Sequence, residues 1–132
     1  MSGLILKLGP RERLLINGAV IENGERRSRV KVITDNTKIL RLKDAIHPND
    51  ANTPVKRACY FAQLLLSGDL DESTASRQLM NEIDTLGQVF SDENSISTLL
   101  HAKSHLQQGN AYSCLKLLRS LLPMENHLLS KI

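Results

Sequence analysis

A chain of 132 residues with 41% hydrophobic residues can bury a substantial core, which excludes a wholly disordered protein. Aromatic residues make up 3% and Trp is absent, so the core must consist mainly of Leu, Ile, Val and Ala. No apolar run approaches the roughly 18 residues of a membrane span. The N-terminal MSGLILKLGP is also too short in its apolar run for a signal peptide. We therefore expect a cytoplasmic protein that does not enter a membrane.

The net charge of +3 is divided unequally between the two halves of the chain. Residues 1–57 contain twelve Lys or Arg against six Asp or Glu, whereas residues 58–132 contain five against eight. An anionic partner is therefore expected to bind the first half.

The first 46 residues show the two-residue periodicity of short β-strands. Asn17-Gly18 and Asn23-Gly24 favour two-residue hairpins, because a type I′ turn needs positive φ at both central positions. Asp35-Asn36 is a further turn candidate. The sequence thus predicts a small antiparallel meander of about five strands, at residues 4–8, 14–16, 19–22, 27–34 and 38–42. The side chains expected to face inward are Leu4, Leu6, Leu14, Ile16, Val30 and Val32.

The chain then changes from strands to helices. Residues 47–53 are rich in turn formers and predict a linker between a basic β module, residues 1–46, and a helical region, residues 54–132. Thr53-Pro54 has the composition of a helix start, and Gly68 of a helix end. The buried face of this first helix is expected to contain Val55, Ala58, Cys59, Ala62, Leu65 and Leu66.

Three more helices follow from the capping residues and the apolar spacing. Asp71, Ser91 and Gly109-Asn110 mark their starts, and Pro123 is expected to end the last one. The apolar positions of the third helix are Ile96, Leu99, Leu100 and Leu106. The predicted fold class is therefore α+β, a small antiparallel β module followed by a bundle of about four helices.

No enzyme signature is present, and we expect no catalytic activity, metal or cofactor. His101 and His105 have the spacing of a metal-binding pair, but the Glu of a zincin and a third ligand are missing, so a solvated or packed pair is preferred. Cys59 and Cys114 form no CxxC pair and are expected to be buried, reduced thiols.

A basic strand is the most informative feature of the first half. In the run from Arg27 to Val32, alternation places Arg27, Arg29 and Lys31 on one face. Arg41 and Lys43 are expected to share a face of the last strand. Cations about 7 Å apart along a strand suit a phosphate backbone, although a solvated strand face is the common alternative. The candidate RNA-binding residues are Arg26, Arg27, Arg29, Lys31, Arg41 and Lys43.

The positions of the aromatic residues restrict the kind of RNA-binding module. All four lie in the helical half, at Tyr60, Phe61, Phe90 and Tyr112. An RRM or a cold-shock module stacks bases on aromatics of its sheet, so both are disfavoured. RNA would instead be bound through Arg, Lys, backbone groups and loop shape.

Residues 11–24, ERLLINGAVIENG after the initial Arg, resemble the opening segment of the FlbT family of bacterial flagellar regulators. Thr53-Pro54-Val55-Lys56-Arg57 is similar to a helix start of that family, and residues 112–122 resemble its last helix. The likeness covers essentially the whole chain. One departure is Pro10-Arg11-Glu12, where the family usually has Pro-Gly-Glu. Because Arg does not readily adopt positive φ, we expect a differently built first turn.

The resemblance implies a post-transcriptional regulator of flagellum biogenesis, because FlbT proteins associate with the 5′ untranslated region of flagellin mRNA. It also implies FlaF, a small protein of the same pathway, or flagellin itself as partners. The sign of regulation is left open, since family members act negatively or positively.

A looser resemblance connects the first half with CsrA, a small β-protein that binds mRNA leaders. Residues 4–7 together with Glu12, Leu14 and Ile16 are similar to the CsrA start, and residues 39–46 are similar to its last strand. Lys43 falls near the position of an RNA-binding arginine. CsrA is a dimer, so a homodimer through the β module is a further expectation.

Two functional hypotheses remain open. The first is an RNA-binding repressor or activator whose β module contacts a flagellin mRNA leader. The alternative is a protein–protein adaptor or chaperone-like module that acts through FlaF or flagellin and uses the acidic helical half.

Overall fold

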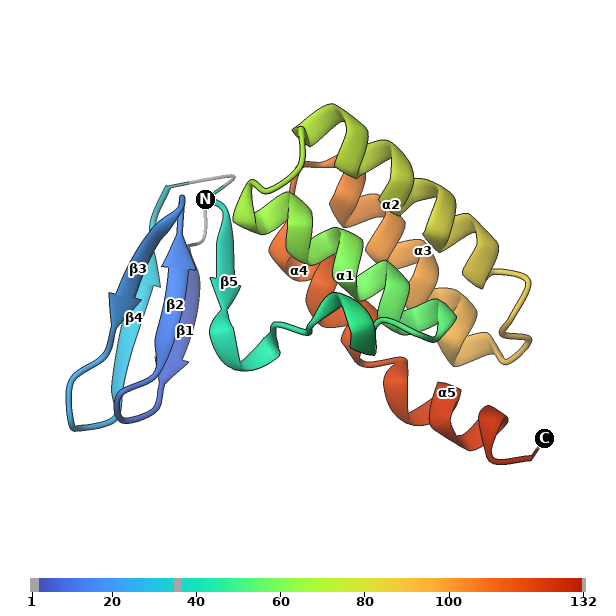
Figure 1. Ribbon diagram of the computed structural model, residues 1–132, viewed down its shortest axis with the longest axis horizontal. Coiled ribbons are helices and arrows are strands. Elements are labelled where there is room, and N and C mark those ends of the chain that lie inside the picture. Colours follow the sequence, from blue (N-terminus) through green and yellow to red (C-terminus); the bar gives the residue numbers. More distant parts are fainter. Residues whose placement is uncertain (1–2, 35–36, 132) are drawn as a thin grey trace.

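The computed structural model describes residues 3–34 and 37–131 and has a β part followed by a helical part (Figure 1). The predicted Asp35-Asn36 turn lies outside the described residues. Within them, five short antiparallel strands precede the helices, which confirms the predicted α+β fold. The strands are β1 (Leu4–Leu8), β2 (Arg13–Ile16), β3 (Ala19–Glu22), β4 (Ser28–Val32) and β5 (Ile39–Arg41).

Two 3₁₀ turns connect the β part to the helices, at Leu42–Asp44 and Pro48–Asp50. The helices of the described chain are α1 (Pro54–Ser67), α2 (Glu72–Leu86), α3 (Glu93–Gln107), α4 (Ala111–Arg119) and α5 (Leu122–Leu129). The prediction for Pro123 was wrong, since Pro123 stands in the first turn of α5 rather than at the end of α4. Proline suits that place because the first N–H groups of a helix have no partner within it. No described helix is long and apolar enough to cross a membrane.

The strands do not form the predicted meander. β1 pairs with β4 in a two-stranded sheet, and a second sheet has the order β3-β2-β5. Asn17 and Gly18 have φ of 49° and 85°, which confirms the type I′ hairpin between β2 and β3. Asn23-Gly24 forms no such hairpin, because the chain crosses there from one sheet to the other.

Asn23 explains the crossing between β3 and β4. Its side-chain amide donates to the carbonyl oxygens of Gly9 and Arg26, at 2.7 and 2.9 Å, and its oxygen accepts from the Ser28 hydroxyl at 2.7 Å. The backbone N–H of Asn23 also donates to the Glu12 carbonyl. These bonds use the side chain that would otherwise support a tight turn, and they hold residues 23–27 against the loop between β1 and β2.

The two sheets lie one behind the other and enclose a small core (Figure 1). Leu6 and Leu14 are 2% and 0% exposed, while Leu4, Ile16 and Val32 are partly buried. Val30 was expected to face largely inward, but it is 38% exposed because no further strand pairs with the other edge of β4 within the described residues.

The helical part follows the predicted pattern closely. All six residues expected on the inner face of α1 are buried. Thr53 caps α1 by accepting from the Lys56 N–H, and Asp71 caps α2 by accepting from the Thr74 N–H. The cap of α3 is Asp92 rather than Ser91.

Two apolar positions of α3 differ from the prediction. Ile96 and Leu100 are 39% and 62% exposed, because α3 packs against α2 and α4 mainly through Leu99, Ala102 and Leu106.

The β part and the helices share one continuous core. Leu40 of β5 is 2% exposed, and β5 is the strand that packs against α1. From the other end of the chain, the buried carboxylate of Glu125 on α5 accepts hydrogen bonds from the Thr53 hydroxyl and from the Val55 N–H. An anion is favoured there because the N–H groups of a helix start carry partial positive charge.

Leu14→Ala is expected to lower the free energy of unfolding by about 2–5 kcal/mol, because the side chain is fully buried and its removal leaves a cavity. Leu100→Ala is the matched control, and its effect should stay within about 0.5 kcal/mol since the side chain is 62% exposed. Chemical denaturation followed by circular dichroism measures both. An unchanged midpoint for Leu14→Ala would contradict the position of β2.

Both cysteines are buried and unbridged, as predicted. Burial raises the pKa of the Cys59 and Cys114 thiols to about 12, so little thiolate exists at neutral pH. We expect neither thiol to react with iodoacetamide in the folded protein and both to react in denaturant. Alkylation followed by mass spectrometry measures this, and rapid labelling of the folded chain would contradict the packing of α1 against α4.

Candidate nucleic-acid interface

A basic groove opens on the outer face of the β1–β4 sheet, with a volume of about 640 Å³. It brings together the predicted residues Arg27, Arg29 and Lys43. These come from the crossing loop, from β4 and from the 3₁₀ turn after β5, three segments that are separate in the sequence. The complete lining is Lys7, Leu8, Gly9, Glu12, Arg27, Ser28, Arg29 and Lys43.

Lys7 stands directly opposite Arg29 in the β1–β4 pairing. Opposed side chains of an antiparallel pair have Cβ atoms about 4.5–5.5 Å apart, and like charges there destabilise the sheet. Neither residue forms an ion pair within residues 3–34 and 37–131, and both are exposed. Two unneutralised cations facing the same groove create a place that favours an anion.

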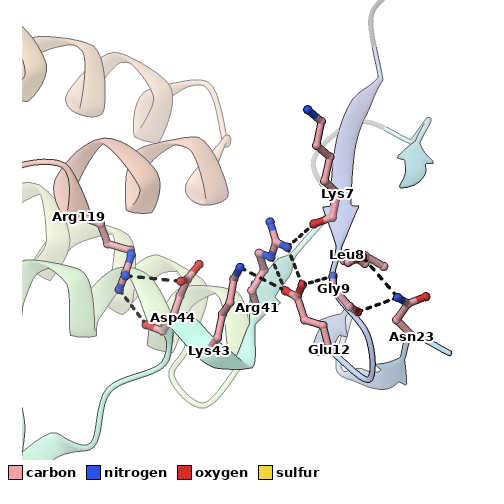
Figure 2. A network of polar contacts seen from close by, with 9 residues as sticks. All are labelled: Lys7, Leu8, Gly9, Glu12, Asn23, Arg41, Lys43, Asp44 and Arg119. Atoms are coloured by element: carbon pink, nitrogen blue, oxygen red, sulfur yellow. Dashed lines mark hydrogen bonds and ion pairs between the residues drawn. The ribbon is translucent and has the colours of Figure 1, made fainter. Parts of the chain in front are cut away.

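Beneath the groove, Arg41 and Glu12 form an ion pair (Figure 2). The Arg41 Nε–Glu12 Oε2 distance is 2.6 Å, and the two side chains are 14% and 9% exposed. A second Arg41 nitrogen donates to the Lys7 carbonyl oxygen, and Glu12 also accepts from the Gly9 N–H. Arg41 therefore connects β5 to β1 and to the loop after it.

Arg41 was predicted to lie on the RNA-facing surface, and the structure places its guanidinium in the ion pair with Glu12. Its guanidinium is engaged by Glu12, and this contact holds the Glu12 carboxyl at a pKa of about 2. A cation that is already neutralised and mostly buried is poorly available for phosphate. The positive charge of Arg41 instead keeps Glu12 ionised and the loop of residues 9–12 in place.

Lys43 is not on the last strand, which ends at Arg41, but in the 3₁₀ turn that follows. Its side chain is 60% exposed and its Nζ is 4.0 Å from the Glu12 carboxylate. In the same turn, Asp44 pairs with Arg119 of α4 at 3.5 Å, so the helices fix the position of Lys43 at the edge of the groove (Figure 2).

The other two predicted residues are exposed but lie outside the lining of the groove. Arg26 is in the crossing loop, and Lys31 continues the face of Arg29 along β4. Lys7, which lines the groove, was missed because it stands alone among Leu residues. The alternation of side chains along β1 could have identified it, because Lys7 lies on the face of the strand opposite the face that carries Leu6 and Leu8.

Comparison with known proteins identifies the group to which the chain is related. Residues 4–129 match the family model described as flagellar protein FlbT. The chain belongs to the FlbT family. The FlbT relatives include a probable flagellum biosynthesis repressor protein of Chelativorans sp. (strain BNC1), 31% identical over 95% of this chain and 83% of the relative.

Two further FlbT relatives come from Caulobacter. The protein of Caulobacter sp. (strain K31), also named a probable flagellum biosynthesis repressor, is 31% identical and matched over 98% of both chains. The flagellum biosynthesis repressor protein FlbT of Caulobacter vibrioides (strain ATCC 19089 / CIP 103742 / CB 15) is 29% identical over 98% of this chain and 91% of its own length. No solved structure matches the chain significantly.

Arg11 stands where the FlbT pattern usually has Gly, and the structure shows how an Arg is accommodated there. Arg11 has a φ of 61°, so it takes the left-handed conformation that a Gly adopts at no steric cost. Arg11 thus adopts the positive φ that an Arg was not expected to take readily. The Arg11 N–H donates to the Gly24 carbonyl, and its guanidinium pairs with Glu22 and Glu25 at 3.4 and 3.0 Å, contacts that offset the strain.

Proposed function

We propose that this FlbT family member is a non-enzymatic regulator of flagellum biosynthesis that binds the 5′ untranslated region of flagellin mRNA in the cytoplasm and controls its translation or decay. The observation that carries the proposal is the basic groove on the β1–β4 sheet. Lys7, Arg27 and Arg29 meet there, and none of them has an acidic partner among the described residues.

The chemistry of the groove suits a phosphate backbone. Guanidinium groups form paired hydrogen bonds with phosphate oxygens, and Arg27 and Arg29 supply two of them.

The lining contains no aromatic side chain, so bases would not be held by stacking. Binding of this kind depends on charge and on the shape of the RNA, and any base preference must come from hydrogen bonds at the groove edge. We therefore expect binding that weakens strongly as the salt concentration rises.

The test is a titration of fluorescent flagellin leader RNA with the full chain at several salt concentrations. Each phosphate contact to single-stranded RNA contributes about 0.7 to the slope of log affinity against log salt. Arg27→Ala should therefore weaken binding to every sequence and make the slope shallower by about 0.7. Arg77→Ala, an exposed change on α2 with the same loss of charge, is the control and should leave the slope unchanged.

An Arg27→Ala variant with the slope of the unaltered protein would remove Arg27 from the RNA site. Equal effects of Arg27→Ala and Arg77→Ala would reduce the binding to a general attraction between a basic protein and RNA.

The second candidate function is an adaptor that acts through FlaF or flagellin. A specific observation favours it, an apolar groove of about 180 Å³ between α2 and α3. Ile83 and Leu99 lie in its floor, and Ile96 and Leu100 are exposed beside it. If the protein is an adaptor, Leu100→Arg abolishes the interaction with FlaF or flagellin, and Arg27→Ala leaves that interaction unchanged. If RNA is the target, Arg27→Ala weakens RNA binding, and Leu100→Arg leaves RNA binding unchanged.

A further inference from the structure

The β part ends on one side in two unpaired strand edges. β3 is one edge strand of the three-stranded sheet, and β4 is one edge strand of the two-stranded sheet. Both lie on the side away from the helices, one behind the other (Figure 1). The opposite side is closed, because β5 packs against α1 and the Arg41 guanidinium donates a hydrogen bond to the Lys7 carbonyl oxygen of β1. An exposed pair of edges with free N–H and C=O groups is a site for further strand pairing.

The hydrophobic core extends to this open side, where the side chains of its last strands are exposed. Leu14 of β2 is 0% exposed, but its direct cross-strand partner on β3, Ile21, is 41% exposed. Leu6 of β1 is 2% exposed, but its partner on β4, Val30, is 38% exposed. Ile21 and Val30 thus belong to the inner faces of the two sheets, and only a missing neighbour leaves them in water.

The arrangement of the edges is self-complementary. Residues 23–27 join β3 to β4, and the crossing between the layers makes these two strands run in opposite directions. A two-fold axis parallel to the strands, passing between the layers at the open side, places β3 of one copy beside β4 of a second copy. The symmetry places β4 beside the second β3 in the same way, so all four edges are used at once.

We propose that two copies of this chain join through these edges, with β3 of each paired antiparallel to β4 of the other. Each two-stranded sheet then extends the other copy's three-stranded sheet into one of five strands. The expectation of a homodimer through the β module gains a defined geometry in this way, and it stands whether or not the groove binds RNA.

Side-chain polarity selects the register. Pairing Ile21 with Val30 of the partner subunit keeps both side chains in the core. The same register sets Glu22 opposite Arg29 of the partner subunit, an opposite-charge pair of the kind that stabilises adjacent strands. Glu22 also pairs with Arg11 and Arg13 of its own chain, and these contacts hold its carboxylate at the edge of the strand. In the dimer, Lys7 and Arg27 then remain as the cations of the groove without an acidic partner among the described residues.

Pairing β3 with β4 of the second copy fits these edges better than pairing either strand with its own counterpart. Pairing β4 with another β4 around Val30 would oppose Arg29 and Lys31, which are both cations. Pairing β3 with β3 alone would leave β4 and Val30 in water. Only the exchange of β3 and β4 satisfies both edges and closes the assembly after two chains.

Analytical ultracentrifugation of the full chain at micromolar concentration tests the proposal. The expected mass is that of two chains. Ile21→Lys should weaken association at least tenfold, because it places a charge in the joined core. Ile5→Lys is the matched control, since Ile5 is also exposed, at 52%, but stands on the outer face of β1 away from the edge.

Circular dichroism checks that each variant is folded, and Val30→Lys provides an independent disruption from the other strand if Ile21→Lys fails to fold. The proposal is overturned if the unaltered chain sediments as a monomer. A dimer that persists in both folded edge variants, or that dissociates equally in Ile5→Lys, would also overturn it.

Discussion

Reversing the charges of Lys7 and Arg27 together is expected to abolish binding of the flagellin leader RNA while the protein remains folded. Each charge-assisted hydrogen bond contributes about 1.5–3 kcal/mol, so losing two lowers the affinity about 10²–10⁴-fold, and repulsion of phosphate by the new carboxylates adds to this. Both side chains are exposed, and removing the like-charge pair of Lys7 and Arg29 relieves the sheet rather than straining it. Titration at fixed salt measures the change.

The matched control is Arg57→Glu with Arg77→Glu on α1 and α2. It changes the net charge by the same amount and alters two residues that are equally exposed but distant from the groove. We expect at most a few-fold loss of affinity. Equal losses in the two double variants would show that net charge, and not the groove, governs binding.

Glu12→Ala is expected to destabilise the protein by about 3 kcal/mol at neutral pH. The change leaves the guanidinium of Arg41 without its carboxylate in a site where only 14% of the side chain is exposed, and breaking such pairs costs about 3–5 kcal/mol. Glu25→Ala is the control, because its ion pair with Arg11 is exposed on both sides and should contribute less than about 1 kcal/mol. Denaturant unfolding measures both.

The same contact predicts a pH dependence. The hydrogen bonds from Arg41 lower the pKa of Glu12 from the ordinary 4.5 to about 2, so folding favours the ionised carboxylate. The stabilisation is therefore fully present above pH 4.5 and is lost as the pH falls through 2. One pKa unit corresponds to about 1.4 kcal/mol, so up to about 3 kcal/mol is lost over this interval.

The difference in stability between the unaltered chain and Glu12→Ala should consequently shrink as the pH falls from 5 to 2. A difference that stays constant over that range would show that Glu12 is not ionised in a tight pair with Arg41.

The helical half could be predicted almost completely from the sequence, and local chemistry explains why. Thr53, Asp71 and Gly68 act on backbone groups within four residues of themselves, so their effects are visible in the sequence. Pro123 is one exception, because proline has the same chemistry at a helix start as just beyond a helix end. Which of these two places Pro123 takes depends on where α4 ends, and the tertiary packing ends α4 at Arg119.

The strands could be located but their pairing could not. Alternation fixes which side chains share a face, yet it does not say which neighbour a strand takes. Asn23-Gly24 has the sequence of a tight hairpin, and it forms a crossing because the Asn23 side chain bonds to residues of the loop after β1. A contact between residues fourteen apart leaves no local pattern.

The candidate site was predicted in part for the same reason. Arg27 and Arg29 followed from alternation, whereas the neutralisation of Arg41 depends on Glu12, 29 residues earlier in the chain. Val30 was predicted to face inward but is partly exposed, because an inner-face side chain is fully buried only if its strand has a neighbour on both sides.

Cross-linking of RNA to the protein in the native cell shows directly whether the basic groove binds flagellin leader RNA. Ultraviolet irradiation of living cells, purification of the full chain, and mass spectrometry of the peptides carrying a nucleotide identify both the RNA and the contact. We expect flagellin leader sequences attached to peptides from β1 and from residues 26–31. Nucleotides found only on peptides of α1–α5, or no enrichment of flagellin leader RNA, would contradict it.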